Sequence, residues 1–345
     1  MRPGSKACSR REFVARATAT ALACGGVSRI CGAAVASETD AAPADPATPI
    51  IIDTHTHFFD PTRAIPAGRD LAVPWPSKGS SLFKTTLPPD WEALARPLGM
   101  RGTVVVEASN WLEDNDWILE LAERHRSIVG FIGNLSGTAI EQGEEVAVWD
   151  DIARFRREVR RLSENPIFRG IRVAGRAVAD DASDGRYPHF ELLADKGLVV
   201  DVLRVPAADV VALAKAVPSL TIIVDHMFTI RDTSTPSEQW KSDITTLAET
   251  KSTVLKVSGL VEGLNAPQTD VESALALCRG AIDHAYEAFG PERLMFGSNW
   301  PVSQPKATMA VVTGIVREYF RSEGPDVLAN VLGGNAKKVY GHLDR

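Results

Sequence analysis

The sequence predicts an α/β protein, a single-domain (β/α)8 barrel of the TIM type preceded by an N-terminal export signal. From residue 50 onward, eight short runs rich in β-branched residues alternate with amphipathic helical patterns. Nearly continuous apolar runs of this kind indicate a parallel sheet covered by helices. Eight units in about 295 residues fit a closed barrel better than an open sheet. No glycine-rich phosphate-binding motif follows any run, which disfavours a nucleotide-binding fold.

The predicted strands come first in each unit. In chain order they read PIIIDTHTHF, RGTVVVEAS, SIVGFIGNL, IFRGIRVAG, GLVVDVLRV, LTIIVDHM, STVLKVSGL and RLMFGSNW. Predicted helices between them include NDWILELAERH, VWDDIARFRREVRRLSEN, AADVVALAKAV and SDITTLAETK, and another follows the last strand at 306–320. Residues 60–89 are rich in Pro and Gly, so we expect a long first loop over the mouth of the barrel.

Residues 1–36 resemble a twin-arginine signal peptide. Arg10 and Arg11 precede Phe13, a weakly apolar stretch follows at 17–27, and Ala34-Val35-Ala36 offers a small-residue cleavage site. The alternative is a basic, disordered tail on a cytosolic protein. The apolar stretch is too short to span a bilayer. We therefore expect export by the twin-arginine machinery to the periplasm or the medium, without a permanent membrane anchor.

Residues 37–49 form a Pro/Ala/Asp linker, and the barrel is expected over 50–345. The formal net charge of the whole chain is -6, which gives no reason to expect nucleic acid as a partner. Three of the four cysteines lie in the leader. Only Cys278 remains, so the exported chain has no internal disulfide and depends on its core for stability.

Polar residues at the carboxyl ends of the strands face the active-site rim in such a barrel. In chain order they are His55 and His57, Glu107, Asn134, Arg172, Arg204, His226, Lys256 and Asn299. His55 and His57 are two residues apart on one strand, so they point to the same side. With His226 at the end of another strand, they indicate a shared site rather than isolated hydrogen-bonding histidines.

Six motifs together resemble the amidohydrolase superfamily, in its amidohydrolase-related branch. In the family's order they read DTHTHF, RGIR, PSLTIIVDHM, LKVSGL, AFGPERLMFGSNWPV and GGNAKKVYG. That branch includes fuconolactonase, pyrone dicarboxylate lactonase and nonoxidative decarboxylases. The resemblance implies catalytic or metal-binding roles for His55, His57 and His226. GIRVAG and LVVDVLR lack the lysine and histidine of the superfamily's binuclear sites, so no binuclear metal centre is expected.

Asn299 departs from the family pattern, because the family usually has an aspartate in this GSDWP position. An amide can donate or accept a hydrogen bond, but it cannot hold a proton taken from water. General-base assistance is worth about 3 to 5 kcal/mol of barrier. Three explanations follow: Glu107, His226 or His57 is the base, an activated lactone needs no base, or the site binds without catalysing.

Metal dependence stays open between two readings. Three neutral imidazoles can hold one divalent metal, with Zn²⁺ favoured, and leave a position for water. Loss of an anionic ligand lowers the affinity of the site for harder ions such as Mn²⁺ more than its affinity for Zn²⁺. Some lactonases of this branch are similar in sequence but act without metal, and their histidines donate hydrogen bonds to the ester carbonyl.

Cationic and aromatic rim residues suggest the nature of the ligand. Arg172 and Lys256 would suit an anionic or carbonyl-bearing small molecule, and Glu107 and Trp300 are further candidate ligands of the substrate. The alternative is a structural ion pair with Glu107 or Asp201. Trp75, Trp111 and Trp300 could present a flat apolar surface to a ring, or could pack.

The sequence thus indicates an exported barrel hydrolase that opens a lactone or cyclic ester of a carbohydrate or aromatic acid. Its histidines would polarise the carbonyl or hold a metal, and Asn299 would orient water or substrate. A metal-dependent nonoxidative decarboxylase is the second hypothesis, and a periplasmic binding barrel without turnover is the third.

The export signal generates a direct prediction. Replacing Arg10 and Arg11 by Lys should leave a full-length precursor in the cytoplasm, because paired arginines are the element that this export route reads. Immunoblots of cytoplasmic and periplasmic fractions measure the effect, with the wild-type chain as the control. Normal processing of the double variant would exclude the twin-arginine assignment.

Overall fold

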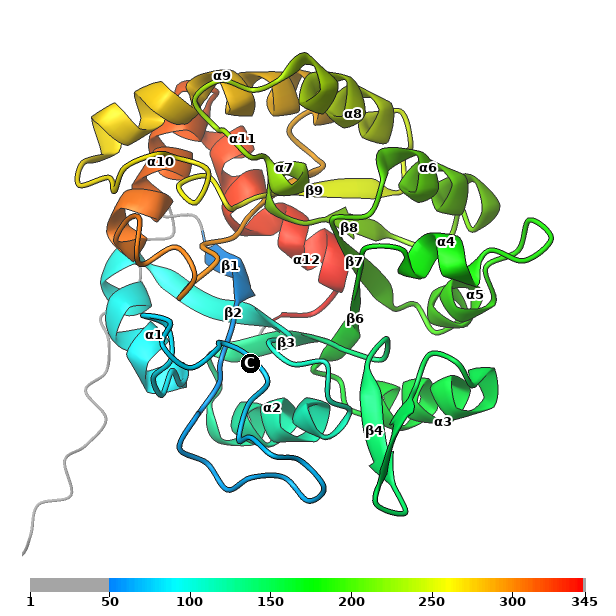
Figure 1. Cartoon of the computed structure of the whole chain (residues 1–345). Coiled ribbons are helices and arrows are strands. Elements are labelled where there is room, and N and C mark those ends of the chain that lie inside the picture. The colour runs from blue at the N-terminus through cyan, green and yellow to red at the C-terminus, as the bar shows by residue number, and fades with distance from the viewer. Residues whose placement is uncertain (1–49, 344–345) are drawn as a thin grey trace, which may run out of the picture. The chain divides into compact units, whose positions relative to one another are not determined.

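Eight parallel strands form the centre of residues 50–343, the part of the chain that the computed structural model describes (Figure 1). The signal peptide and the linker predicted for residues 1–49 lie outside that part. The strands are β1 (Ile51–Thr56), β2 (Met100–Val106), β3 (Ile128–Gly133), β6 (Phe168–Ala174), β7 (Val199–Leu203), β8 (Ile222–Val224), β9 (Thr253–Val257) and β10 (Leu294–Phe296). Each coincides with one predicted run, so the strand prediction is confirmed.

Helices surround these strands in Figure 1 and cover the outer face of the sheet. They are α1 (Pro88–Ala95), α2 (Glu113–Arg124), α3 (Ile152–Ser163), α4 (Ala177–Asp181), α5 (Pro188–Asp195), α6 (Ala207–Ala216), α7 (His226–Thr229), α8 (Glu238–Ala248), α9 (Val271–Phe289), α10 (Met309–Ser322), α11 (Pro325–Ala329) and α12 (Asn335–Tyr340). Short 3-10 and π turns stand at Arg96–Leu98 and Asn330–Gly334. In this described part, no helix is both long and apolar enough to cross a membrane.

The sheet is nearly closed by contacts between its first and last strands. Hydrogen-bonded neighbours follow chain order from β1 to β10, as expected for a (β/α)8 barrel. Thr56 and Trp300 form a parallel bridge, and the amide of His57 donates to the carbonyl of Trp300 at 2.9 Å. Below it, the buried carboxylate of Asp53 accepts from the Ser298 amide at 2.8 Å and from its hydroxyl at 2.6 Å. This seam brings residue 53 against residue 298.

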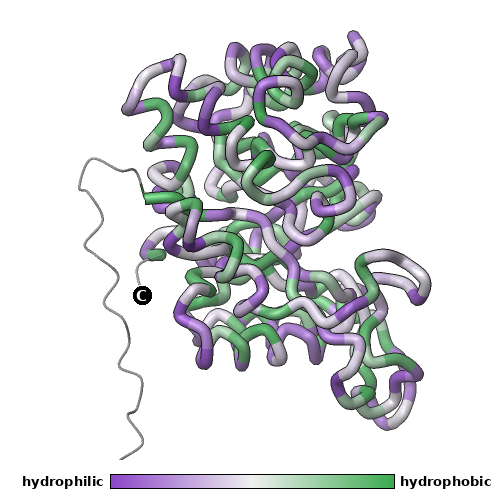
Figure 2. Tube along the Cα trace, turned by 90° about the vertical axis from the view of Figure 1, so that its left-hand side faces the viewer, coloured by the Kyte–Doolittle hydropathy of each residue, from purple (hydrophilic) through white to green (hydrophobic). Residues whose placement is uncertain are grey.

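Two hydrophobic clusters stabilise the barrel. The larger one joins the outward-facing strand residues to the helices. The strand residues that alternate with these, such as Ile52 and Val104, point to the other face of the sheet. They form the smaller cluster with Ala336 and Tyr340 of α12. The smaller cluster is therefore the barrel interior, with α12 packed against it. Figure 2 shows apolar and polar residues interleaved along the trace, as expected for elements that bury one face.

One feature was missed from the sequence, an antiparallel hairpin of β4 (Thr138–Glu141) and β5 (Glu144–Ala147). Its two-residue turn consists of Gln142 and Gly143, with φ of 54° and 87°. Turns with two positive φ values match the twist of the strands they join. Arg154 fastens the hairpin to α3 by donating to the Ala147 carbonyl at 3.0 Å.

The glycines of the barrel yield a matched prediction. A Cβ on Gly170 in β6 would lie 2.0 Å from the Val199 carbonyl oxygen, whereas a Cβ on Gly280 in α9 would have no atom within 4 Å. Gly170→Ala should destabilise the fold by about 1 to 3 kcal/mol. Gly280→Ala should stabilise it by about 0.5 to 1 kcal/mol. Urea unfolding measures both, and equal effects would contradict this packing.

Candidate active site

A cavity of about 600 Å³ lies at the carboxyl ends of the strands. Five of the predicted site residues line it, namely His57, Glu107, Arg172, His226 and Asn299. Pro74 and Trp75 line it as well. Both belong to the long first loop, which confirms that this loop covers the mouth of the barrel. The Trp75 ring lies 5.8 Å from the ring of His57 and provides a flat apolar wall.

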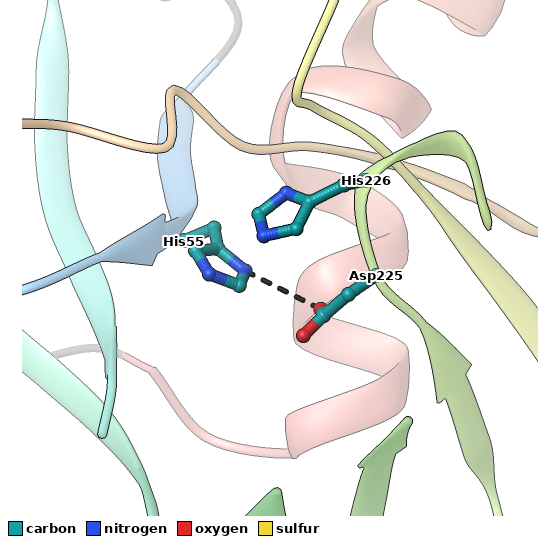
Figure 3. Close-up of side chains that lie close together, drawn as sticks. All are labelled: His55, Asp225 and His226. Atoms are coloured by element: carbon teal, nitrogen blue, oxygen red, sulfur yellow. Dashed lines mark ion pairs between the residues drawn. The ribbon is translucent and has the colours of Figure 1, made fainter. Parts of the chain in front are cut away.

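The three histidines form one cluster. The ring centroid of His55 lies 4.9 Å from that of His57 and 4.2 Å from that of His226. Figure 3 shows His55 and His226 side by side, with Asp225 below His55. The Nδ1 atom of His57 is 2.9 Å from the Val106 carbonyl, which fixes that ring. The grouping predicted from the sequence is therefore present in the fold.

Burial keeps all three imidazoles neutral. Burial, helped by the positive charge of Arg172, lowers the pKa of His57 to about 3. Burial also lowers the pKa of His226 to about 4, with Asp225 opposing the change and Arg172 adding to it. Burial also places the pKa of His55 well below its ordinary value, against the opposing effect of Asp225. At neutral pH each ring thus offers one N–H and one lone pair, as needed to bind a metal or a carbonyl.

His226 stands at the start of a left-handed turn. Residues 226–229, which make up α7, have φ values of 53°, 49°, 57° and 52°. Non-glycine residues seldom adopt this conformation, which costs about 1 to 2 kcal/mol each. Gly259 makes room for it, because a Cβ there would lie 2.7 Å from the His226 Cβ. The turn aims the imidazole at the cavity, and the Ser258 hydroxyl contacts its Nδ1 at 3.0 Å.

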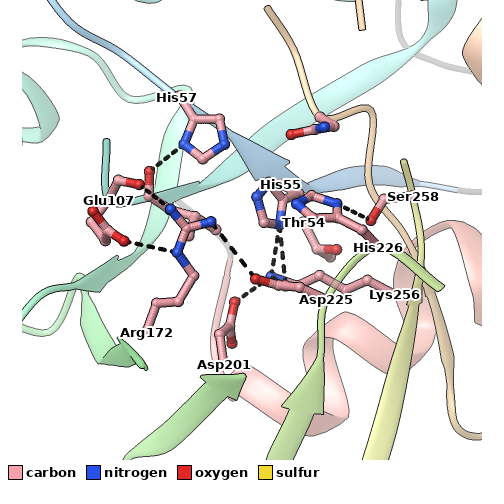
Figure 4. A network of polar contacts seen from close by, with 12 residues as sticks. Thr54, His55, His57, Glu107, Arg172, Asp201, Asp225, His226, Lys256 and Ser258 are labelled. Carbon is pink, nitrogen blue, oxygen red and sulfur yellow. Dashed lines mark hydrogen bonds and ion pairs between the residues drawn. The ribbon is translucent and has the colours of Figure 1, made fainter. Parts of the chain in front are cut away.

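A buried charge cluster lies under the histidines (Figure 4). The Lys256 ammonium is fully buried, donates to Asp201 and lies 3.2 Å from Asp225. Burial opposes ionisation of Asp225, but Lys256 and His55 hold its pKa well below the usual range. Burial raises the pKa of Asp201 to about 7, although Lys256 opposes the rise. Lys256 therefore belongs to a structural ion-pair cluster beneath the cavity. The sequence predicted that it binds the substrate, but it does not line the cavity.

Arg172 and Trp300 also differ from the simplest expectation. The Arg172 guanidinium donates to the side chain and the carbonyl of Glu107, both at 2.8 Å, although both residues line the cavity. The two are thus an ion pair, the alternative considered for Arg172. Trp300 is 2 % exposed and packs against Phe58 at the seam instead of lining the cavity. Trp300 therefore packs in the core next to the site and is not placed to contact a bound ligand.

Asn299 has a partner that the sequence did not reveal. Its amide Nδ2 donates to Oε1 of Glu262 at 2.7 Å, and Glu262 lines the same cavity. Asn299 also has a φ of 54°, a conformation that Asn tolerates better than most residues. An aspartate at this position would place two carboxylates in contact. The amide therefore fits both its backbone conformation and its neighbour.

Several other functional residues were missed, and some had a signal. Asp225 precedes His226 at the end of a strand. Asp201, a charged residue inside an apolar strand, was considered from the sequence only as a possible ion-pair partner. Glu262 stands five residues beyond its strand, in a loop without a recognisable pattern. Arg231 likewise lies in a loop and lines the cavity.

The donor set fits a zinc ion. His55, Asp225 and His226 offer ligand atoms that all lie within 4.8 Å of one another. The Nδ1 of His55 lies 3.2 Å from the Lys256 ammonium and 3.3 Å from Asp225. When Nδ1 donates to Asp225, the buried, unpartnered Nε2 carries a lone pair for a metal. When Nδ1 accepts from Lys256, Nε2 carries the proton instead and can donate to a carbonyl.

Comparison with known proteins places the fold and the site in one family. The amidohydrolase family model matches residues 52–342. The chain therefore belongs to the amidohydrolase family, which confirms the resemblance noted in its motifs. It is 28% identical to an L-fucono-1,5-lactonase of Burkholderia ambifaria, over 85% of this chain and 96% of that protein.

Two further proteins are similar along nearly their whole length. An L-fucono-1,5-lactonase of Burkholderia multivorans is 26% identical over 84% of this chain and 95% of its own. The crystal structure of a Burkholderia multivorans amidohydrolase with bound zinc is 25% identical, with a TM-score of 0.66 over 84% of this chain and 99% of that one. The findings support a lactonase-type hydrolase.

The charge cluster yields a stability prediction. Lys256→Met removes the cation and leaves Asp201 and Asp225 buried without it, so the free energy of unfolding should fall by about 3 to 5 kcal/mol. Lys251→Met, at an exposed position, should change it by less than about 0.5 kcal/mol. Urea unfolding at pH 7.5 measures both variants. A loss below about 1 kcal/mol for Lys256→Met would contradict the pairing.

Proposed function

We propose that the protein is a lactonase that opens the ring ester of a carbohydrate or aromatic acid. The observation that carries the proposal is the convergence of three neutral imidazoles beside a cavity of about 600 Å³. This volume suits a single sugar ring or aromatic ring. The L-fucono-1,5-lactonases that match most of the chain support the same chemistry.

The imidazoles act on the ester carbonyl. An N–H group aimed at the carbonyl oxygen stabilises the negative charge that develops there when water attacks the carbon. His57 and His226 line the cavity and are placed for this role, and the buried Nε2 of His55, which has no hydrogen-bond partner among the described residues, lies behind them. His55 and His226, with Asp225, would also hold Zn²⁺, which when bound supplies a Lewis acid for the same carbonyl; His57, predicted as a third ligand, is not in this group.

Two arginines indicate that the substrate carries a negative group. Arg204 and Arg231 line the cavity and are exposed. Within residues 50–343, neither side chain has a hydrogen bond or an ion pair. A carboxylate on the lactone could be held by either guanidinium in a bidentate pair. Trp75 would then cover the apolar face of the ring.

Export is the second part of the proposal. The paired arginines, the short apolar stretch and the small-residue cleavage site at 1–36 support delivery to the periplasm or the medium by the twin-arginine route. The lactonase would then meet its substrate outside the cytoplasm.

A lactone panel tests the activity. The purified protein is incubated with L-fucono-1,5-lactone, other aldonolactones and carboxylated aromatic lactones, before and after treatment with a chelator. Ring opening releases a carboxylic acid, so the proton release is followed with a pH indicator. Turnover of a lactone supports the proposal. Release of CO2 from aromatic acids would support the decarboxylase instead, and ligand binding without turnover would support a binding barrel.

The histidines yield a prediction on activity. His55→Ala and His226→Ala should each lower kcat/KM for the lactone at least about 100-fold, because each removes a group that acts on the carbonyl. His342→Ala, at an exposed position, is the matched control. Thermal unfolding and zinc analysis of all three variants accompany the kinetics. Intact turnover with a lowered melting temperature would show that His55 and His226 only pack.

A further inference from the structure

The pair of Glu262 and Asn299 presents two acceptors to one place. Oε1 of Glu262 accepts from Asn299, while Oε2 of Glu262 and Oδ1 of Asn299 are buried and have no hydrogen-bond partner among the described residues. Both residues line the cavity. A buried polar atom without a partner costs free energy, so such atoms in proteins usually meet a donor. No donor from residues 50–343 meets these two atoms, so a ligand or water is left to supply one.

The loop that carries Glu262 is held in place against the histidine cluster. Gly259 packs under His226, and a Cβ on Gly263 would lie 2.7 Å from the hydroxyl of Thr233. The same hydroxyl donates to the Leu260 carbonyl at 2.8 Å. The carboxylate therefore does not sit on a free loop, and its position relative to His226 is fixed by close packing.

We propose that Glu262 is the proton acceptor for the water that attacks the lactone, and that Asn299 positions its carboxylate. The proposal deepens the lactonase function and rests on it. The proposal assigns the general base to Glu262 and not to residue 299, where the family motif has an aspartate. The amide of Asn299 then serves to hold the Glu262 carboxylate in place. Glu262 touches the reacting water and is the catalytic residue, whereas Asn299 acts through it.

Other bases at the cavity are less suited. The Glu107 carboxylate forms an ion pair with Arg172, so a proton on Glu107 would remove the negative partner of that largely buried cation. His57 and His226 each have one ring nitrogen engaged, since Nδ1 of His57 lies 2.9 Å from the Val106 carbonyl and Nδ1 of His226 lies 3.0 Å from the Ser258 hydroxyl. Burial raises the pKa of Glu262 above its ordinary value, although Asn299 opposes this. A raised pKa brings the carboxylate nearer to the range of an efficient general base.

Few charged groups surround Glu262. From α9 the Cys278 thiol faces it, and burial together with Glu262 raises the pKa of that thiol to about 12, so it stays neutral. Lys306 from the loop after β10 donates to the Leu264 carbonyl. From the loop after β8, the Arg231 carbonyl would lie 3.2 Å from a Cβ on Gly263. Among the described side chains, Asn299 donates to the carboxylate, and the backbone of Glu262 and of Val261 also lowers its pKa by hydrogen bonding.

The step balances with water as the only co-reactant. The water oxygen forms a bond to the carbonyl carbon while one of its protons passes to the Glu262 carboxylate. The ring C–O bond then breaks, and the leaving alkoxide takes the proton from the Glu262 carboxyl. The product is the open hydroxy acid, which ionises to its carboxylate, and Glu262 is returned in the ionised form.

Glu262→Gln is the decisive variant, because it keeps the shape and the Asn299 contact but cannot accept a proton. With the lactone that the wild-type protein turns over, kcat should fall by about 100- to 10,000-fold while KM changes less than about threefold. The wild-type rate should be full above the Glu262 pKa and fall as the pH drops through it, since only the ionised form is a base. This acidic limb should be absent in Glu262→Gln. Glu287→Gln, exposed on α9, is the matched control.

Two changes at Asn299 test the positioning role. Asn299→Gly removes the donor without straining the positive φ, so the Glu262 pKa should rise and the acidic limb should move to higher pH. Asn299→Asp places a second carboxylate against Glu262 and should move the limb further in the same direction. Zinc content is measured for each variant, and thermal unfolding shows whether each is folded. Glu262→Asp is the substitute if Glu262→Gln fails to fold.

Each contrary result points to a different error. A Glu262→Gln protein that keeps both kcat and the acidic limb overturns the assignment and leaves the lactonase function standing. A rise in KM alone also overturns it, because Glu262 would then bind a hydroxyl of the substrate. An Asn299→Asp protein with a tenfold gain in kcat would return the base to the family position. No turnover of any lactone by the wild-type protein would overturn the proposed function and this inference together.

Discussion

The rest of the site depends on the ion pairs of the buried Lys256 ammonium. This group lies between Asp201 on β7, Asp225 after β8 and His55 on β1. The ammonium donates to Asp201, forms an ion pair with Asp225 at 3.2 Å and lies 3.2 Å from Nδ1 of His55. In a low-dielectric interior such charges are costly to bury and strongly attractive once paired. Lys256, with Arg172 3.8 Å from Asp225, therefore stabilises the two carboxylates that lie under the histidines.

The same cation sets the chemistry of His55. Asp225 and Lys256 compete for Nδ1 of the ring, and the outcome decides whether Nε2 bears a lone pair or a proton. A metal site needs the lone pair, and a hydrogen bond to a carbonyl needs the proton. Metal-bound and metal-free hydrolysis, the two modes proposed for this site, would therefore differ by one proton position on His55. A single arrangement of side chains can support both without a change in fold.

The sequence predicted the fold more fully than the site. Strand runs and helical periodicity depend on neighbours along the chain, so all eight strands could be assigned, while the hairpin at 138–147 was missed because its strands are short and polar. The histidines were found because strand ends converge at one rim. The state of Lys256 and the partner of Asn299 depend on contacts across 55 and 37 residues, which no local pattern specifies.

The seam between β1 and β10 links the site to the completion of the chain. Asp53 and Ser298 are 245 residues apart, and the segment made up of β1 and the residues just after it, which carries His55 and His57, is bordered by the segment that carries Asn299. Contacts of such separation form late, because most of the chain has to be ordered before they stabilise it. A partly synthesised or partly folded chain would lack one wall of its own cavity. The active site is therefore complete only when the seam between β1 and β10 has closed. Local opening of that seam would abolish activity while the helices stay folded.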